Sequence, residues 1–280
     1  MTDTPTYGTA SLFRDSTRLT RDEARDLVAR LEHRAKSEDE ARARAEYLSL
    51  LELVPGQRVL DVGCGSGVVA RDAARRVQPN GHVVGIDPSP ALIDAAQELT
   101  DASEVAGRVS FQVGDCRALS VRDGCFDAAV AATVLTHVPD AQRAVLEMIR
   151  VVRPGGRVGV FDFDGDAVLF AHPDRALTRR IVAALSDHAA VNGWLVRELP
   201  AVFKRAGLED IHVRAFMPLE QHAGTFYANM AERAAVVARD SGAITSDEYA
   251  RWMEALRQRL SAEEFLAGRL HLFCWGRKPG

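Results

Sequence analysis

The glycine-rich segment LDVGCGSG carries the clearest chemical signal of this 280-residue sequence. Gly63, Gly65 and Gly67 follow a short apolar run, and Asp61 stands two residues before the first of them. Glycine lets the backbone approach a ligand closely and make a tight turn from a strand into a helix. A dinucleotide site uses G-x-G-x-x-G, but position 68 is Val, and the Asp61 carboxylate would repel a pyrophosphate. The segment therefore predicts a site for a small ligand with a cationic group.

More polar side chains come at the ends of other apolar segments. Asp87 ends the next segment along the chain, Asp115 follows the third, His137 lies just past the fourth, and Asp162 ends the fifth. Ligands of open α/β sheets bind outside the carboxyl ends of the strands. We therefore expect these side chains to face one site.

No metal site is predicted. Asp162, Asp164 and Asp166 suggest a cation site, but the segment lacks the length and the Glu of a calcium loop. We expect a turn with solvated carboxylates there. The four cysteines are scattered, with no C-x-x-C and no Cys/His cluster at zinc-ligand spacing.

Composition and charge exclude several classes of protein. The net charge is −4 and the isoelectric point about 6.1, so no basic field indicates nucleic acid or an anionic membrane as a partner. The first residues lack the basic and apolar regions of a signal peptide, and no apolar run approaches the roughly 18 residues of a membrane helix. We expect a cytoplasmic protein with no membrane partner.

An alternation of strands and helices must position the polar residues. Strands and helices that alternate at this spacing along the chain predict a parallel sheet with helices on both faces. The predicted strands are 58–62, 82–86, 108–113, 126–132 and 157–161, and the predicted helices between them are 68–77, 91–99 and 141–152. Before them lies a helical stretch over 20–53, in which Thr20 and Glu23 predict a capping box.

With its elements in this order, the sequence resembles the class I S-adenosylmethionine (SAM) dependent methyltransferases. LDVGCGSG, Asp87, Gly114-Asp115 and PGG before the fifth strand match the landmarks of that family, over roughly residues 45–165. The amino-acid sequence of these motifs is most similar to that of the small-molecule branch, which includes ubiquinone/menaquinone-type and natural-product methyltransferases. The resemblance implies an α/β fold with a Rossmann-like seven-stranded sheet, whose last strand, near 270–276, is antiparallel between the fifth and sixth.

The resemblance also implies the roles of the cofactor-binding residues. Gly63 and Gly65 would cradle the methionine part of SAM, and Asp61 would favour its cationic end. Asp87 would accept hydrogen bonds from both ribose hydroxyls, because a carboxylate offers two acceptor oxygens to a diol. Asp115 would accept from the adenine amino group, and S-adenosylhomocysteine (SAH) would be the product. The implied set is Asp61, Gly63, Cys64, Gly65, Asp87, Pro88, Gly114, Asp115, Cys116, Ala132 and Thr133.

His137 and Asp162 are the predicted catalytic residues. Neighbouring parallel strands lie about 5 Å apart, so these two side chains could meet above the sheet. Methyltransferases that this sequence resembles often carry a His and an Asp at these places. We predict that His137 takes a proton from the acceptor and that Asp162 orients it, the alternative being that His137 only caps the next helix.

A small molecule is the predicted methyl acceptor. The segment after the fourth strand, residues 132–137, lacks both the Asn/Asp-Pro-Pro-aromatic motif of adenine and glutamine methylation and the Pro-Cys of cytosine methylation. We expect an N-terminal arm and helices over 1–54, the arm being 1–17, a SAM-binding core over 55–165, and acceptor-binding helices over 166–280 with a helical cap at 226–266. The candidate lining residues are Phe163, Phe170, His172, Trp194, Met217, Phe226, Tyr227 and Met230.

Two other functions stay open at this point. A SAM-binding enzyme of the same fold could catalyse a reaction without methyl transfer, such as a cyclisation. A nicotinamide oxidoreductase is the third class, and Val68 and Asp61 both argue against it. A homodimer is kept as one option for the assembly.

Overall fold

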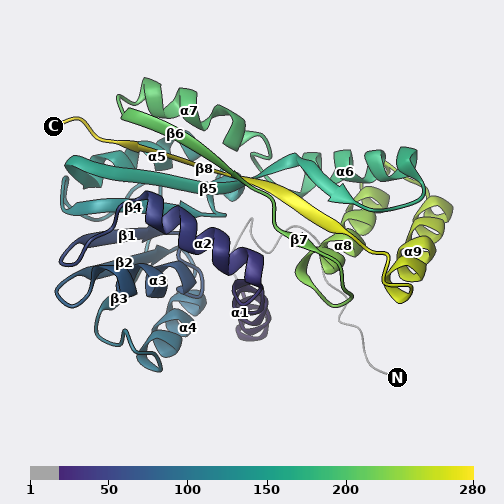
Figure 1. Ribbon diagram of the computed structural model, residues 1–280, viewed down its shortest axis with the longest axis horizontal. Helices are drawn as coiled ribbons and strands as arrows, with labels where there is room; N and C mark the ends of the chain where they lie inside the picture. Colours follow the sequence, from purple (N-terminus) through teal and green to yellow (C-terminus); the bar gives the residue numbers. More distant parts are fainter. Residues whose placement is uncertain (1–18) are drawn as a thin grey trace.

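The computed structural model describes residues 19–280, so the predicted arm over 1–17 lies outside the described residues. Within the described part, eight strands form one sheet in the order β3-β2-β1-β4-β5-β8-β6, and the two-residue β7 pairs with β8 (Figure 1). The strands are β1 (Arg58–Val62), β2 (His82–Asp87), β3 (Val109–Val113), β4 (Phe126–Ala132), β5 (Val152–Phe170), β6 (Glu209–Phe216), β7 (Leu219–Glu220) and β8 (Ala267–Arg277).

The helices of the described part are α1 (Arg21–Ala35), α2 (Glu38–Leu50), α3 (Val68–Val77), α4 (Pro90–Asp101), α5 (Ala141–Val151), α6 (Arg175–Ala189), α7 (Leu195–Arg205), α8 (Phe226–Asp240) and α9 (Ser246–Ser261), with a 3-10 turn at Leu135–His137. The predicted capping box is confirmed, because Thr20 and Glu23 exchange both hydrogen bonds. The single stretch expected over 20–53 is two helices instead. The first ends at Ala35 with Lys36 as its C-cap, and Ser37 caps the second by accepting a hydrogen bond from the Glu40 N–H.

The predicted topology is confirmed. β1 pairs in parallel with β2 and β4, β4 pairs in parallel with β5, and β8 is antiparallel to both β5 and β6. Apolar residues of β1 alternate between two cores. Leu60 and Val62 pack with α5 and α7, whereas Val59 packs with α2 and α3. Since successive strand residues point to opposite faces, the helices cover both sides of the sheet.

β5 is the main departure from the predicted elements. The expected strand 157–161 is the central part of a strand of 19 residues, which crosses the expected boundary at 165 and continues beyond the sheet beside β8. Figure 1 shows these two strands reaching out to α6, α8 and α9. These helices and the ends of the two strands share a separate apolar core, which includes Ile181, Tyr227 and Trp252. We call this part the helical unit.

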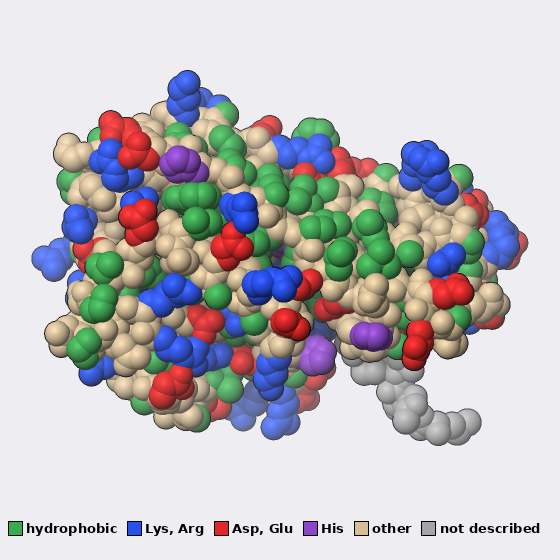
Figure 2. Space-filling model, in the orientation of Figure 1, with side chains coloured by type: hydrophobic (Ala, Val, Ile, Leu, Met, Phe, Trp, Pro, Cys, Tyr) green, Lys and Arg blue, Asp and Glu red, His purple; other side chains and the backbone are tan. Residues whose placement is uncertain are grey.

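The predicted helical cap before the last strand corresponds to α8 and α9 of the helical unit. On the face of the molecule shown in Figure 2, acidic and basic side chains are interspersed, and no broad patch of one sign gathers there. Within residues 19–280, no helix combines the length and the apolar character needed to cross a bilayer.

Candidate functional site

A cavity of about 1060 Å³ extends from the glycine-rich segment to the helical unit. α1 forms part of its wall through Leu27, Leu31 and Arg34. All the predicted cofactor-contacting residues and the predicted base line this cavity: Asp61, Gly63, Cys64, Gly65, Asp87, Pro88, Gly114, Asp115, Cys116, Ala132, Thr133 and His137. Of the candidate acceptor residues, Phe163, Phe226 and Met230 line it, whereas Phe170, His172, Trp194, Met217 and Tyr227 are not on its wall.

The glycine-rich segment forms the predicted turn between β1 and α3. Gly63 has a φ of +69°, and a Cβ there would lie 2.4 Å from a methyl carbon of Val134. The backbone N–H groups of Gly63 and Cys64 both donate to the Ile86 carbonyl, at 2.7 and 3.0 Å. These contacts require glycine at position 63, and they bring the tips of β1, β2 and β4 together at one end of the cavity.

Asp61 is a buried carboxyl with a free oxygen. Its side chain is 1% exposed, and its Oδ2 atom has no hydrogen-bond partner in the part of the chain that the structure describes. Burial, helped by the nearby Asp87 carboxylate, raises the pKa of Asp61 to about 7. An unpaired buried carboxylate oxygen on a cavity wall is costly, and a cationic ligand group would relieve that cost.

Asp87 is also buried, but both its oxygens have partners. Oδ2 accepts from the Gly65 N–H and Oδ1 from the Ser89 N–H, each at 3.0 Å. Burial raises the pKa of Asp87, and these two hydrogen bonds oppose the rise. Each carboxylate oxygen keeps a second lone pair. Asp87 is therefore held rigidly on the cavity wall with acceptor capacity for two hydroxyls.

Asp115 and Thr133 both line the cavity. The Asp115 carboxylate accepts from the Arg117 guanidinium at 2.7 Å, and this ion pair lowers its pKa. Its predicted adenine contact must therefore be made beside the Arg117 side chain. Thr133 has a φ of +56°, and its N–H donates to the Phe161 carbonyl at 2.6 Å. This unusual backbone, just past β4, carries some strain.

The structure changes the expected role of Asp162. The side chain is fully buried and does not line the cavity, whereas His137 does. Its carboxylate accepts from the Thr136 hydroxyl and N–H, at 2.8 and 3.1 Å, and from the Phe163 N–H at 3.0 Å. Burial raises its pKa, and these hydrogen bonds oppose the rise. Asp162 thus holds the turn that presents His137 and is not placed to touch a ligand.

Asp164 corrects the expectation of a turn with solvated carboxylates over 162–166, a segment that belongs to β5. It is 3% exposed and forms an ion pair with Arg197, with N–O distances of 2.5 and 2.8 Å. The Arg197 guanidinium in turn lies 4.0 Å over the Trp194 ring. Among residues 19–280, no group of three or more His, Cys, Asp or Glu side chains is arranged to hold a metal ion.

Contacts from α1 were not foreseen in the sequence. Glu32 accepts from the Ser66 hydroxyl and from Arg71, both at 2.7 Å, and Arg71 also donates to the Ser66 carbonyl. These hydrogen bonds connect α1 to the glycine-rich segment, and α1 therefore forms the cavity wall next to that segment. No spacing rule connects Glu32 with residues 34 and 39 positions further on, so this contact had no signal in the sequence.

The comparison with known families argues against one of the classes left open. Residues 59–156 match the family described as "Methyltransferase domain". This chain carries a methyltransferase domain. The matched segment contains the glycine-rich turn, Asp87, Asp115 and His137. The nicotinamide oxidoreductase alternative is therefore set aside.

The sequences of curated relatives that are named methyltransferases are consistent with this family match. The ubiquinone/menaquinone biosynthesis C-methyltransferase UbiE of Geotalea daltonii is 35% identical over 123 residues, which are 44% of this chain and 52% of that protein. The chain spans about half the length of the curated relatives it matches.

Solved structures show the same fold at lower identity. Phosphoethanolamine N-methyltransferase 2 of Haemonchus contortus, solved with SAH, has a TM-score of 0.61 at 18% identity and covers 99% of this chain and 62% of that one. The [4+2]-cyclase SpnF has a TM-score of 0.55 at 24% identity and covers 86% and 81%. Class I methyltransferase architecture is thus shared by proteins whose names describe different reactions.

Proposed function

We propose that this chain is a SAM-dependent methyltransferase that methylates a small molecule and releases SAH. One observation carries the proposal. The methyltransferase domain places the glycine-rich turn, the free Asp61 oxygen and Asp87 at one end of a cavity whose other end is formed by the helical unit. One continuous cavity can therefore hold a cofactor and an acceptor end to end. The name of the relative UbiE supports a quinone-like acceptor, and a natural-product acceptor stays a prediction. A cytoplasmic location and a homodimer stay predictions.

The residues present fit SAM. The free oxygen of Asp61 would accept from the ammonium group, and Asp87, whose oxygens keep acceptor capacity beside their bonds to Gly65 and Ser89, would accept from the two ribose hydroxyls. The glycine backbone at positions 63 and 65 leaves room for the methionine part. Gly114 and Asp115 would contact the adenine, and Arg117, which is paired with Asp115, also lines this part of the cavity. Bound SAM supplies the electrophilic methyl group on its sulfonium.

The chain's own contribution to the reaction is alignment and a base. α1 and the helical unit form walls of the cavity in which the two reactants would be aligned. The Asp162–Thr136 contact holds the 3-10 turn, and this turn points His137 to the cavity between its two ends. His137 accepts the proton of the acceptor's hydroxyl, amine or acidic C–H. Positioning of the two reactants accounts for most of the rate enhancement of such a displacement.

A labelled methyl group tests the proposal. The protein is incubated with SAM carrying a tritiated methyl group and a panel of quinols, phenols and apolar acids, and organic-soluble product is counted. We expect label in at least one product and one SAH formed per label. Asp87→Ala should lose most of the product at limiting SAM. Tight SAM binding without any transferred label would instead favour a reaction such as cyclisation, in which SAM keeps its methyl group.

A further inference from the structure

Arg269 is a buried cation on the cavity wall that no part of the proposed function uses. It lies on β8 and is 9% exposed. Its guanidinium carbon stacks 3.6 Å from the centre of the Phe163 ring. The Nε atom has no hydrogen-bond partner, and the guanidinium forms no ion pair with any residue over 19–280. Burial lowers its pKa to about 10, so it remains charged at neutral pH.

The nearby carboxylates are committed to other partners. Glu40 binds Arg34 through two hydrogen bonds, at 2.8 and 3.1 Å, and also accepts from the Tyr227 hydroxyl. Asp162 accepts its hydrogen bonds from Thr136 and Phe163. The Arg34–Glu40 pair is neutral as a unit, and Asp162 favours the Arg269 cation electrostatically but forms no hydrogen bond with its guanidinium. Burying an unpaired charge is expensive unless a ligand brings the opposite charge.

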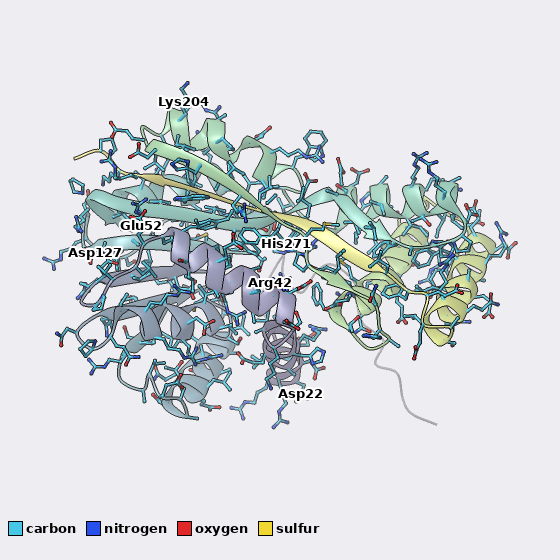
Figure 3. The ribbon with its side chains drawn as sticks, in the orientation of Figure 1. Asp22, Arg42, Glu52, Asp127, Lys204 and His271 are labelled. Atoms are coloured by element: carbon cyan, nitrogen blue, oxygen red, sulfur yellow. The ribbon has the colours of Figure 1, made fainter. Side chains whose placement is uncertain are left out.

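His271 does not balance this charge either. Figure 3 labels it on β8, where the strand passes from the sheet toward the helical unit. Arginine only donates, so the 3.4 Å contact with the Arg34 Nη2 makes the His271 Nε2 the acceptor. Its Nδ1 then carries the proton and donates to the Arg269 carbonyl at 3.0 Å. His271 is thus neutral, and it fixes the backbone of Arg269 rather than its side chain.

The pairing between β5 and β8 is irregular beside Arg269, and we infer that this irregularity gives a ligand access to the Arg269 side chain. Phe163 pairs with His271, and Val168 pairs with Arg269, so β5 makes an irregular excursion over 164–167 opposite β8. The wall that the helical unit contributes includes the apolar residues Leu185, Met230 and Met253 and also the charged residues Glu232 and Arg233. A ligand at Arg269 therefore contacts a buried cation and has apolar side chains along part of its length.

We propose that Arg269 binds the carboxylate of an apolar acid, which is the methyl acceptor. This proposal rests on the proposed function and names the class of its substrate. Phe163 covers one face of the guanidinium, so a ligand approaches its edge. The Nε–H and a neighbouring Nη–H on that edge match the two oxygens of a carboxylate. A single positive charge also matches a carboxylate better than a phosphate monoester, which carries nearly two negative charges at pH 7.

Calorimetry with matched probes tests this inference. Octanoate, octanamide and octyl phosphate are titrated into the protein saturated with SAH. The amide keeps the shape of the acid but removes its charge. We expect octanoate to bind at least tenfold more tightly than octanamide, since a charge-assisted bond to a buried group is worth about 1.5–3 kcal/mol. Equal binding of these two probes, or tighter binding of octyl phosphate, would overturn the proposal.

Two variants assign the effect to Arg269. Arg269→Met keeps an apolar contact with Phe163 and should remove the preference for octanoate, whereas Arg269→Lys should keep part of it. Arg180→Gln is the matched control, because Arg180 pairs with Glu248 in the helical unit and does not line the cavity. A preference for octanoate that persists in Arg269→Met would overturn the proposal.

Measurements of SAH affinity and thermal stability distinguish a role of Arg269 in acceptor binding from a role in cofactor binding or in folding. We expect Arg269→Met to unfold at the same or a higher temperature, since it removes an unpaired buried charge, and to bind SAH as the wild type does. A stable variant with weaker SAH binding would mean that Arg269 holds the cofactor's carboxylate, which contradicts the proposal. Failure of the wild type to bind SAH would reject the proposed function, while octanoate titrated into the SAH-free protein would still report on Arg269.

Discussion

Thr136 is bound to Asp162 twice, through its hydroxyl at 2.8 Å and its backbone N–H at 3.1 Å. Both side chains are fully buried. The two bonds tie the 3-10 turn after β4 to the neighbouring strand β5. Because His137 is the last residue of that turn, its position over the cavity depends on this pair.

The Thr136–Asp162 pair should be coupled energetically. We expect Thr136→Val and Asp162→Asn each to destabilise the protein, because each leaves a buried polar group of the partner without its hydrogen bond. The double variant should cost less than the sum of the single variants, by about 0.5–3 kcal/mol. Urea unfolding of the four proteins measures the difference. Strict additivity would show that the pair does not hold the turn.

His137 should matter for turnover and not for cofactor binding. General-base catalysis contributes typically about 10²–10⁴-fold, so His137→Ala should lower kcat by that range with an acceptor that must lose a proton. SAH affinity, measured by calorimetry, should stay nearly unchanged. Asp162→Asn should lower kcat less, since it only loosens the turn. The N-cap of α5 is Asp140 and not His137, which contradicts the helix-cap alternative. Near-full turnover of His137→Ala at saturating substrate would therefore mean that alignment alone drives the reaction.

Asp61 should make cofactor binding depend on pH. Its raised pKa of about 7 means that the carboxyl is neutral below that pH and cannot pair with an ammonium group. We expect SAH affinity to fall by up to about tenfold per pH unit as the pH drops from 7 to 5.5. Asp61→Asn should bind SAH weakly at every pH in this range. A wild-type profile as flat as that of the variant would contradict the assignment.

The same carboxyl should affect stability in the opposite sense. Because the folded protein binds the Asp61 proton more tightly than the unfolded chain does, this group stabilises the ligand-free protein at low pH. That contribution is lost as the pH rises from about 4 through about 7. We expect urea titrations of Asp61→Asn to lack this part of the pH dependence. Stability curves of wild type and variant that run parallel between pH 4 and 8 would refute the burial effect.

The sequence predicted the sheet and the cofactor end of the cavity because both depend on local signals. Apolar runs gave the strands, and the glycine-rich turn placed Asp61 and Asp87 at neighbouring strand tips. Contacts between distant segments carry no such signal. Asp162 was expected beside His137 from strand spacing alone, but the turn directs the Thr136 side chain to it instead.

Arg269 was missed for a similar reason. A single arginine in a late strand gives no pattern, and only the extension of β5 and β8 beyond the sheet brings it to the cavity beside Phe163. The length of β5 was itself underestimated, because Asp162 and Asp164 interrupt its apolar pattern. Their burial depends on partners at Thr136 and Arg197, which lie on other elements.

Calorimetric titration of SAH and NADH into the wild type, Asp87→Ala and the control Asp94→Ala tests the central claim most directly. Asp94 is an exposed residue of α4 that does not line the cavity. We predict that SAH binds the wild type and Asp94→Ala and that NADH binds neither. Asp87→Ala should bind SAH about ten- to a hundredfold more weakly, through the loss of a charge-assisted acceptor worth about 1.5–3 kcal/mol. Equal SAH affinity for wild type and Asp87→Ala, or tighter binding of NADH than of SAH, would contradict the account.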